Sequence, residues 1–479
     1  MHGRGRRRLI PLGSELLPGS SQPRAGKVAC VAFVLSLCGA AAPDAAAAAS
    51  SAPESALAQT PSHALSLAEA LALAHEQNPE LLIRRARAAR AAGEKLRSRQ
   101  GVLPTVSLDA TYLKADVGLL DGVPVLTPGS TPGLGFVSAN PVEGNLLGVQ
   151  LLQPLVNFEA WAAGRQAGHL EQAAQLGARR TRDEVTVATI ASYFGASTAQ
   201  RRVAAESRGL ATARRALRQA EAALEEGLVS RLDRLQARTR VAEMEARVAA
   251  ARSGVVRAHS VLRQVLGLDG EGLIPLADAM PEPPSSLSPG NNQVLERSDL
   301  RARKKALDAA QAGVERARAG YLPAVNLVLR YQRLELNQPV GLNETDWVLG
   351  VNLGWTIFAG YGRAGALDAA QAAEREARIE LDALRRQARA EERDTRAEWQ
   401  AQRLGWERAR SSVRDAQEAL QLTEARYAEG LDDMRTLLGA QAEVLAADSR
   451  EINARYNALM AAQRYRLAVA AETGAEHLR

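Results

Sequence analysis

The sequence predicts a mostly α-helical protein with a small β part, in which long antiparallel helical hairpins are joined to short strands. Composition is the first observation: 46% of the 479 residues are apolar but only 4% are aromatic, which favours long helices packed through small side chains. The second is a pair of proline-free tracts, residues 157–226 and 360–429, each of which would reach on the order of 105 Å as a helix. The third is a pair of segments of alternating polarity in each half of the chain.

The first 49 residues are predicted to be a signal peptide with an Ala-rich leader. An uncharged stretch, Val28–Ala42, follows six basic side chains and runs into alanines suited to a signal peptidase. We expect cleavage between Ala42 and Ala49, followed by a flexible N-terminal segment over residues 50–65. The uncharged stretch is shorter than the roughly 20 residues that span a bilayer as a helix, so we expect no transmembrane helix after processing.

Charge and cysteine content argue against several classes of protein. Without the leader the formal charge falls from +6 to about +2, and Arg and Glu interleave along the helices, so the pI near 9.5 does not predict nucleic-acid binding. Both cysteines, Cys30 and Cys38, lie in the leader, and we expect neither disulfides nor thiolate chemistry in the mature chain. We expect no lipid anchor at Cys38, because Leu37 before it is larger than the Gly, Ala or Ser usual at such sites.

Two halves of the chain contain the same order of elements and are predicted to be structural repeats, residues 66–268 and 297–475. The stretch "GVLPTVSL" at 101–108 returns as "GYLPAVNL" at 320–327. In each copy a glycine and then a proline stop a helix before a strand begins. The expected helix-to-strand corners are Gly101, Pro104, Gly320 and Pro323.

Each repeat is predicted to begin with a helix and to continue with one strand pair. The first helix, 66–100, starts at a capping box formed by Ser66 and Glu69, and its counterpart spans 297–320. Alternation of apolar and polar residues with a period of two predicts the strands. The pairs are 104–113 with 146–154 in the first repeat and 323–332 with 348–356 in the second.

The long helices, 157–226 and 360–429, are each predicted to turn back at a glycine and continue as a second helix. A glycine inside a continuous helical pattern most often marks a turn, which places hairpin tips at Gly227 and Gly430. The helices after the tips span 230–267 and 432–475, and the length of each long helix approximates the sum of the two shorter helices in its repeat. We therefore expect two shorter helices stacked end to end against each long one. A Pro/Ser-rich equatorial linker, 269–296, joins the repeats.

Four strands cannot close a barrel by themselves, and open sheet edges are not tolerated in lipid. Transmembrane barrels use at least about eight strands of roughly 9–11 residues. Two chains would just reach that number, and three would supply twelve strands around a water-filled lumen.

From about Ser66 to Gly474 the chain resembles the TolC-like family of outer-membrane efflux and export channels. The resemblance rests on both corners and on several motifs in order: "LSLAEALALAHEQNPEL", "GLVSRLDRLQA", "RSDLRA" and "YNALMAAQRYRLAVAAETG". It implies a homotrimer with a 12-stranded transmembrane β-barrel in the outer membrane and a helical tunnel, or α-barrel, across the periplasm. It also implies a periplasmic adaptor (membrane fusion) protein docked at the hairpin tips, and an inner-membrane RND, ABC or similar transporter that supplies the energy.

The tips are the expected sites of adaptor docking and gating. Gly227, Leu228, Val229, Ser230 and Asp233 match the family's first tip, and Gly430 with Leu431 form the second. Asp233 would either hold the tunnel shut through a polar contact or serve as an ordinary charge at the start of a helix. Where well-known members project carboxylates into the entrance, this sequence has Thr436 and Gly439, although Asp432 and Asp433 lie within a turn and would replace them.

Other sites are not predicted. No metal or cofactor site is expected, because the histidines lack paired spacing and no cysteine partners remain, and no residues suggest a catalytic nucleophile or a phosphate-binding loop. Trp347 and Trp355 would lie at the membrane interface or pack between barrel and helices. The alternatives are a periplasmic coiled-coil scaffold and an adaptor subunit, neither of which accounts for two hairpins alternating with two strand pairs. The transported substrate is left open.

Overall fold

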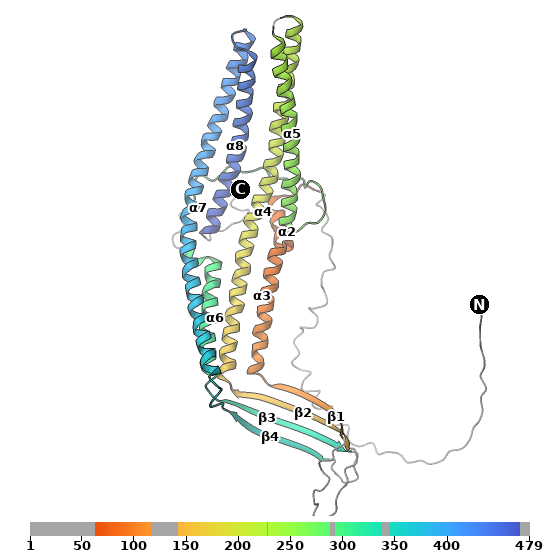
Figure 1. The fold of residues 1–479 in the computed structure, drawn as a ribbon, viewed down its shortest axis with the longest axis vertical. Coiled ribbons are helices and arrows are strands. Elements are labelled where there is room, and N and C mark those ends of the chain that lie inside the picture. The colour runs from red at the N-terminus through yellow and green to blue at the C-terminus, as the bar shows by residue number, and fades with distance from the viewer. Residues whose placement is uncertain (1–62, 116–141, 228, 288–292, 337–343, 470–479) are drawn as a thin grey trace, which may run out of the picture. The chain divides into compact units, whose positions relative to one another are not determined.

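The computed structural model describes residues 63–115, 142–227, 229–287, 293–336 and 344–469. These belong to one unit, residues 59–479 (Figure 1). The predicted signal peptide, most of the N-terminal segment and Leu228 lie outside the described residues.

The first predicted helix is in fact two helices, α2 (Leu67–Gln77) and α3 (Pro79–Ser98). The capping box at Ser66 is present, with the Ser66 amide donating to Glu69 Oε2 at 2.9 Å. The break follows from Pro79, which has no N–H to continue the ladder of α2 and is preorganised for the first turn of α3. Asn78 accepts a hydrogen bond from the Leu81 amide and donates to the Val265 carbonyl at 2.8 Å, so the break is anchored to the distant helix α5 (Arg231–Leu266).

The four strands form a single antiparallel sheet in the order β1-β2-β3-β4. Pairing of β2 with β3 joins the two repeats, with Leu151 opposite Leu329. Strands β1 and β4 are the edges of the sheet. The bounds are β1 (Thr105–Ala115), β2 (Val142–Val156), β3 (Ala324–Leu336) and β4 (Glu344–Gly354).

The remaining helices form two antiparallel hairpins that run between the sheet and the tips (Figure 1). Along α4, α5 packs on the tip side, and α2 and α3 pack toward the sheet; along α7, α8 and α6 pack in the same way. Two shorter helices thus pack along α7, as predicted, whereas three pack along α4 because the first predicted helix is broken at Asn78. Helix α4 also contacts α6 and α8, which holds the repeats together. The bounds are α4 (Phe158–Glu225), α5 (Arg231–Leu266), α6 (Ser298–Ala319), α7 (Gly362–Ala428) and α8 (Met434–Ala468).

The linker between the repeats is fixed to the helices by buried polar side chains. Arg263, which is 5% exposed, donates to three linker carbonyls at 3.1–3.2 Å. His259 Nδ1 accepts a hydrogen bond from the Ile274 amide at 3.1 Å, and Arg455 of α8 donates to the Met280 carbonyl at 2.6 Å. The linker therefore connects the first hairpin to the second at a level between sheet and tips.

Alanine is the commonest buried apolar residue, and larger side chains are buried among the alanines. Tyr193 is among the largest fully buried side chains: its hydroxyl donates to the Leu65 carbonyl at 2.8 Å and accepts from the linker amide of Asp278 at 3.0 Å. Among the helices within the described ranges, none is both long and apolar enough to cross a membrane.

Candidate functional site: hairpin tips and outer face of the sheet

The first tip is a glycine turn followed by a capped helix. Gly227 has φ +75°, and a Cβ at this position would meet no atom within 4 Å, so glycine is required by the backbone conformation and not by crowding. Ser230 and Asp233 form a capping box at the start of α5, in which the Ser230 hydroxyl donates to Asp233 Oδ2 at 2.7 Å and the Asp233 amide donates to Ser230 Oγ.

The second tip follows the same design with different residues. Gly430 has φ +74°, and the amides of Gly430 and Leu431 donate back to the carbonyls of Tyr427 and Arg426 in a Schellman motif. Asp433 caps α8: the Thr436 amide and hydroxyl both donate to its Oδ1, at 2.8 and 2.7 Å. These two hydrogen bonds hold the pKa of Asp433 below its usual value.

The two acidic residues of this tip are not equivalent. Arg426 donates from Nε and Nη2 to the two carboxylate oxygens of Asp432, at 2.9 and 3.2 Å. Asp432 is thus neutralised locally by a bidentate ion pair. Asp433 has no cation partner among the ion pairs of the described residues. No local sequence pattern marks Arg426, because its ion pair joins residues six apart across a turn.

The two tips pack against each other within one chain. Ala220 and Ala237 of the first hairpin form a buried cluster with Met434 and Leu437 of the second. Tyr427 lies against this cluster, where burial raises its pKa and the negative charge of Asp233 raises it further. Among the described residues the hydrogen bonds of Asp233 all go to Ser230 in its own helix cap, so its role in holding the entrance shut stays a prediction.

A groove of about 420 Å³ runs between the hairpins near the tips, along α5 and the start of α8. Leu232 and Leu235 give it an exposed apolar wall, at 58% and 42% exposure. Arg240 and Arg435 place positive charge beside that wall. The remaining lining residues are Gln236, Thr239, Glu243 and Leu438.

The predicted corners lie where the helices meet the sheet, but the two glycines do not end their helices as left-handed caps. Gly101 is in a short 3₁₀ turn and Gly320 has φ −60°, so neither adopts the left-handed conformation of a glycine cap. At Gly101 an added Cβ would lie 2.5 Å from the Ala160 Cβ, so the glycine permits close approach of two chain segments. Pro104 and Pro323 come directly before β1 and β3.

One face of the sheet is apolar across all four strands. In register, Val106 lies opposite Leu151, Leu151 opposite Leu329, and Leu329 opposite Leu349. The other face is more polar: Ser107 lies opposite Gln150, whose side-chain oxygen accepts a hydrogen bond from Arg330 at 2.8 Å. The apolar residues on this face include Leu146, Leu152, Val328 and Val348. A single-layer sheet with these two faces separates an apolar environment from water.

Aromatic side chains lie at both ends of the apolar face. On β4, Trp347 is 69% exposed at the end distant from the helices. Trp355, just after β4, is 59% exposed and donates from its indole to the Tyr321 carbonyl at 3.1 Å. Exposed Phe358 and Tyr361 follow it and contact each other edge to face. Within the part of the chain that the structure describes, no group of three or more His, Cys, Asp or Glu side chains is placed to hold a metal ion.

The family model for outer membrane efflux proteins matches residues 70–268 and 291–471, which includes both hairpins and all four strands. The chain belongs to the outer membrane efflux protein family. Two curated members from Pseudomonas putida, the probable efflux pump outer membrane protein SepC and the toluene efflux pump outer membrane protein TtgF, are each 26% identical over 302 residues. These matches cover 60% of this chain, which spans 63% of the length of those relatives.

The fold of this family member is shared with solved structures. The outer membrane protein VceC of Vibrio cholerae superposes with a TM-score of 0.70 at 18% identity, covering 85% of this chain and 97% of that one. At this identity the similarity concerns the fold.

Proposed function

We propose that this chain is the outer-membrane channel of a tripartite efflux or type I export system. Three copies form a 12-stranded barrel, and their hairpins continue it as a tunnel through the periplasm. The channel performs no chemistry, and an inner-membrane transporter supplies the energy. The observation that carries the proposal is the sheet. It has one apolar and one more polar face, and each of its edge strands, β1 and β4, pairs on one side only among the described strands.

The dimensions of β4 fit a bilayer. Trp347 lies on β4, and Trp355 follows the last residue of the strand, eight residues further along the chain. At about 3.4 Å per residue their separation is about 27 Å along the strand, or about 21 Å along the membrane normal at a tilt of about 40°. Outer-membrane barrels have an apolar band of about 25 Å flanked by aromatic residues. The residues that follow Trp347 on its side of the strand, Leu349, Val351 and Leu353, are all exposed and apolar.

The tips are the proposed sites of adaptor docking. The ends of the hairpins are formed by Gly227, Val229, Ser230, Gly430 and the 62% exposed Leu431. Leu228, also proposed for docking, lies outside the described residues. The groove along Leu232 and Leu235 offers the adaptor an apolar surface beside the tips. We assign charge selectivity at the entrance to Asp433 rather than to Asp432, because Arg426 neutralises Asp432.

The proposal is tested with the full chain purified from membranes in detergent. We expect a trimer by mass measurement, and ion conductance after insertion into planar bilayers. In a strain lacking the gene, we expect increased sensitivity to at least one member of a panel of toxic compounds. A monomer that is stable in buffer without detergent would refute the channel and favour the periplasmic scaffold, for which an exposed apolar sheet face has no use.

A further inference from the structure

A pocket of about 160 Å³ lies between the two hairpins, further from the tips than the groove described above. Its walls come from α4 and α5 of the first hairpin and from α7 and α8 of the second. Leu445 in its lining is 11 residues beyond Met434 of the buried cluster at the tips, which is about 16 Å along α8 at 1.5 Å per residue. The pocket and the groove share Arg240 and are otherwise lined by different described residues.

The inner part of this pocket is apolar and has room for one six-membered ring. Gly209 forms part of the wall, and a Cβ there would lie 3.0 Å from Met244 Cε and 3.1 Å from Leu445 Cδ2, so a larger residue would press on both side chains. An engineered apolar cavity of about 150 Å³ binds benzene, which sets the size of ligand that fits. The apolar side chains of the lining are those of Ala205, Ala213, Met244, Leu420, Val444 and Leu445.

The same pocket contains a half-buried carboxyl group, that of Asp448. Within the described part of the chain Asp448 has neither a hydrogen bond nor an ion pair. Burial raises its pKa, the charge of Arg208 opposes that rise, and the charge of Glu451 adds to it. A partly buried acceptor that lacks a protein donor is stabilised by a ligand that supplies one.

The charges of the lining favour a neutral ligand. Two arginines, Arg208 and Arg240, line the pocket together with Asp448. Arg240 is already paired with Glu243, whose Oε2 it reaches at 3.1 Å, so Arg208 and Asp448 remain and their charges cancel. A charged ligand would give up its hydration without gaining a free opposite charge, whereas a neutral one avoids that cost. The hydroxyl of such a ligand has an acceptor in Asp448 and a donor in Arg208.

We infer that this pocket binds a small neutral phenol. The ring occupies the apolar inner part, and the hydroxyl donates to Asp448 and accepts from Arg208. Because both hairpins supply walls, the ligand binds more tightly when the hairpins are packed together and therefore favours that state. In the proposed channel, on which this last step rests, a bound phenol keeps the entrance shut. With seven non-hydrogen atoms, phenol is expected to bind with a Kd on the order of 1 mM.

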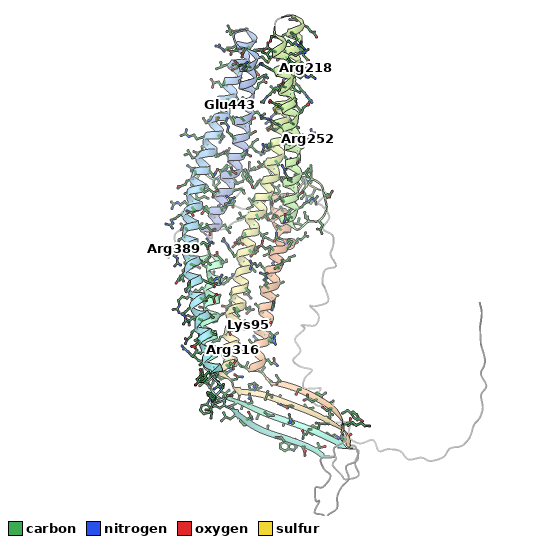
Figure 2. All side chains as sticks on the ribbon, viewed as in Figure 1. Lys95, Arg218, Arg252, Arg316, Arg389 and Glu443 are labelled. Atoms are coloured by element: carbon green, nitrogen blue, oxygen red, sulfur yellow. The ribbon has the colours of Figure 1, made fainter. Side chains whose placement is uncertain are left out.

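Protection of a cysteine in the lining from alkylation tests the binding. In the full chain with Cys30→Ser and Cys38→Ser, the reporter is Gln441→Cys in the pocket. The matched control is Glu443→Cys, an exposed position two residues along the same helix and outside the lining (Figure 2). We expect phenol at about ten times its Kd to slow alkylation of the reporter at least fivefold and to leave the control within twofold.

Changes at Asp448 and in the ligand test the chemistry. Adding Asp448→Ala to the reporter should raise the phenol concentration needed for protection at least tenfold, whereas Asp448→Asn, which keeps an acceptor oxygen, should raise it less than threefold. Benzoate and benzylamine should protect at least tenfold more weakly than phenol. Equal slowing of reporter and control, undiminished protection in the Asp448→Ala variant, or stronger protection by either charged compound would overturn the inference.

Conductance separates this inference from the proposed channel. In planar bilayers we expect phenol at the same concentration to lower the open probability of the unaltered channel at least threefold and to have no such effect on the Asp448→Ala channel. If the chain conducts no ions, the channel is refuted, while alkylation still decides whether the pocket binds phenol. If the chain conducts and phenol protects the reporter without changing the open probability, the site is supported and its effect on the entrance is refuted.

Discussion

In the proposed channel, outward movement of a hairpin at the entrance would separate the two tips of one chain, and this would break the packing of Met434 between them. Its side chain is 2% exposed and packs from α8 against Ala220 and Ala237 of the other hairpin. Replacing a buried Met by Ala costs about 2–5 kcal/mol. Part of this cost falls inside the second hairpin, where Leu437 and Tyr427 also contact the cluster, so we take the lower end.

A loss of about 2 kcal/mol between the hairpins raises the population with separated tips about 30-fold. We therefore expect the Met434→Ala channel to open far more often than the unaltered one in planar bilayers. The control is Leu431→Ala on the same tip, which is 62% exposed and should change stability by less than about 0.5 kcal/mol. Equal open probabilities for the Met434→Ala and Leu431→Ala channels would refute the view that this cluster keeps the entrance shut.

Three further predictions concern single residues. Asp433→Ala removes the cap of α8, and amide exchange in its first turn should rise about fivefold, whereas unchanged exchange would exclude a capping role. Burial and the charge of Arg263 lower the pKa of the His259 imidazole in the folded protein. The contribution of neutral His259 to stability is therefore present above the unfolded-state pKa of about 6.5 and is lost as the pH falls below it. The thermal unfolding temperature should fall over this pH range, and it should fall less in His259→Gln. Gly101→Ala forces a 2.5 Å contact and should destabilise by about 1–3 kcal/mol in denaturant, while Gly93→Ala, with open space around it, should not destabilise.

Local patterns in the sequence determined the elements. Period-two alternation predicted all four strands, and the absence of proline predicted both long helices to within a few residues. Glycine at 227 and 430 predicted both tips, because a left-handed turn needs no partner from elsewhere in the chain. The missed break at Asn78 was also local, since a proline follows it directly, but its anchor to Val265 is not local.

The tertiary structure alone decided two kinds of feature. One is contacts between residues far apart in the chain, and the other is the direction of side chains that packing orients. Pairing of β2 with β3 joins segments about 180 residues apart, and the residues of neither strand specify which strand it pairs with. The ion pair of Arg426 with Asp432 distinguishes two adjacent carboxylates that the sequence leaves equal. Gly101 is required by the approach of Ala160 from another helix. Hydrophobic periodicity is a short-range property that fixes which face of an element is buried, whereas the identity of the covering element depends on how the whole chain packs.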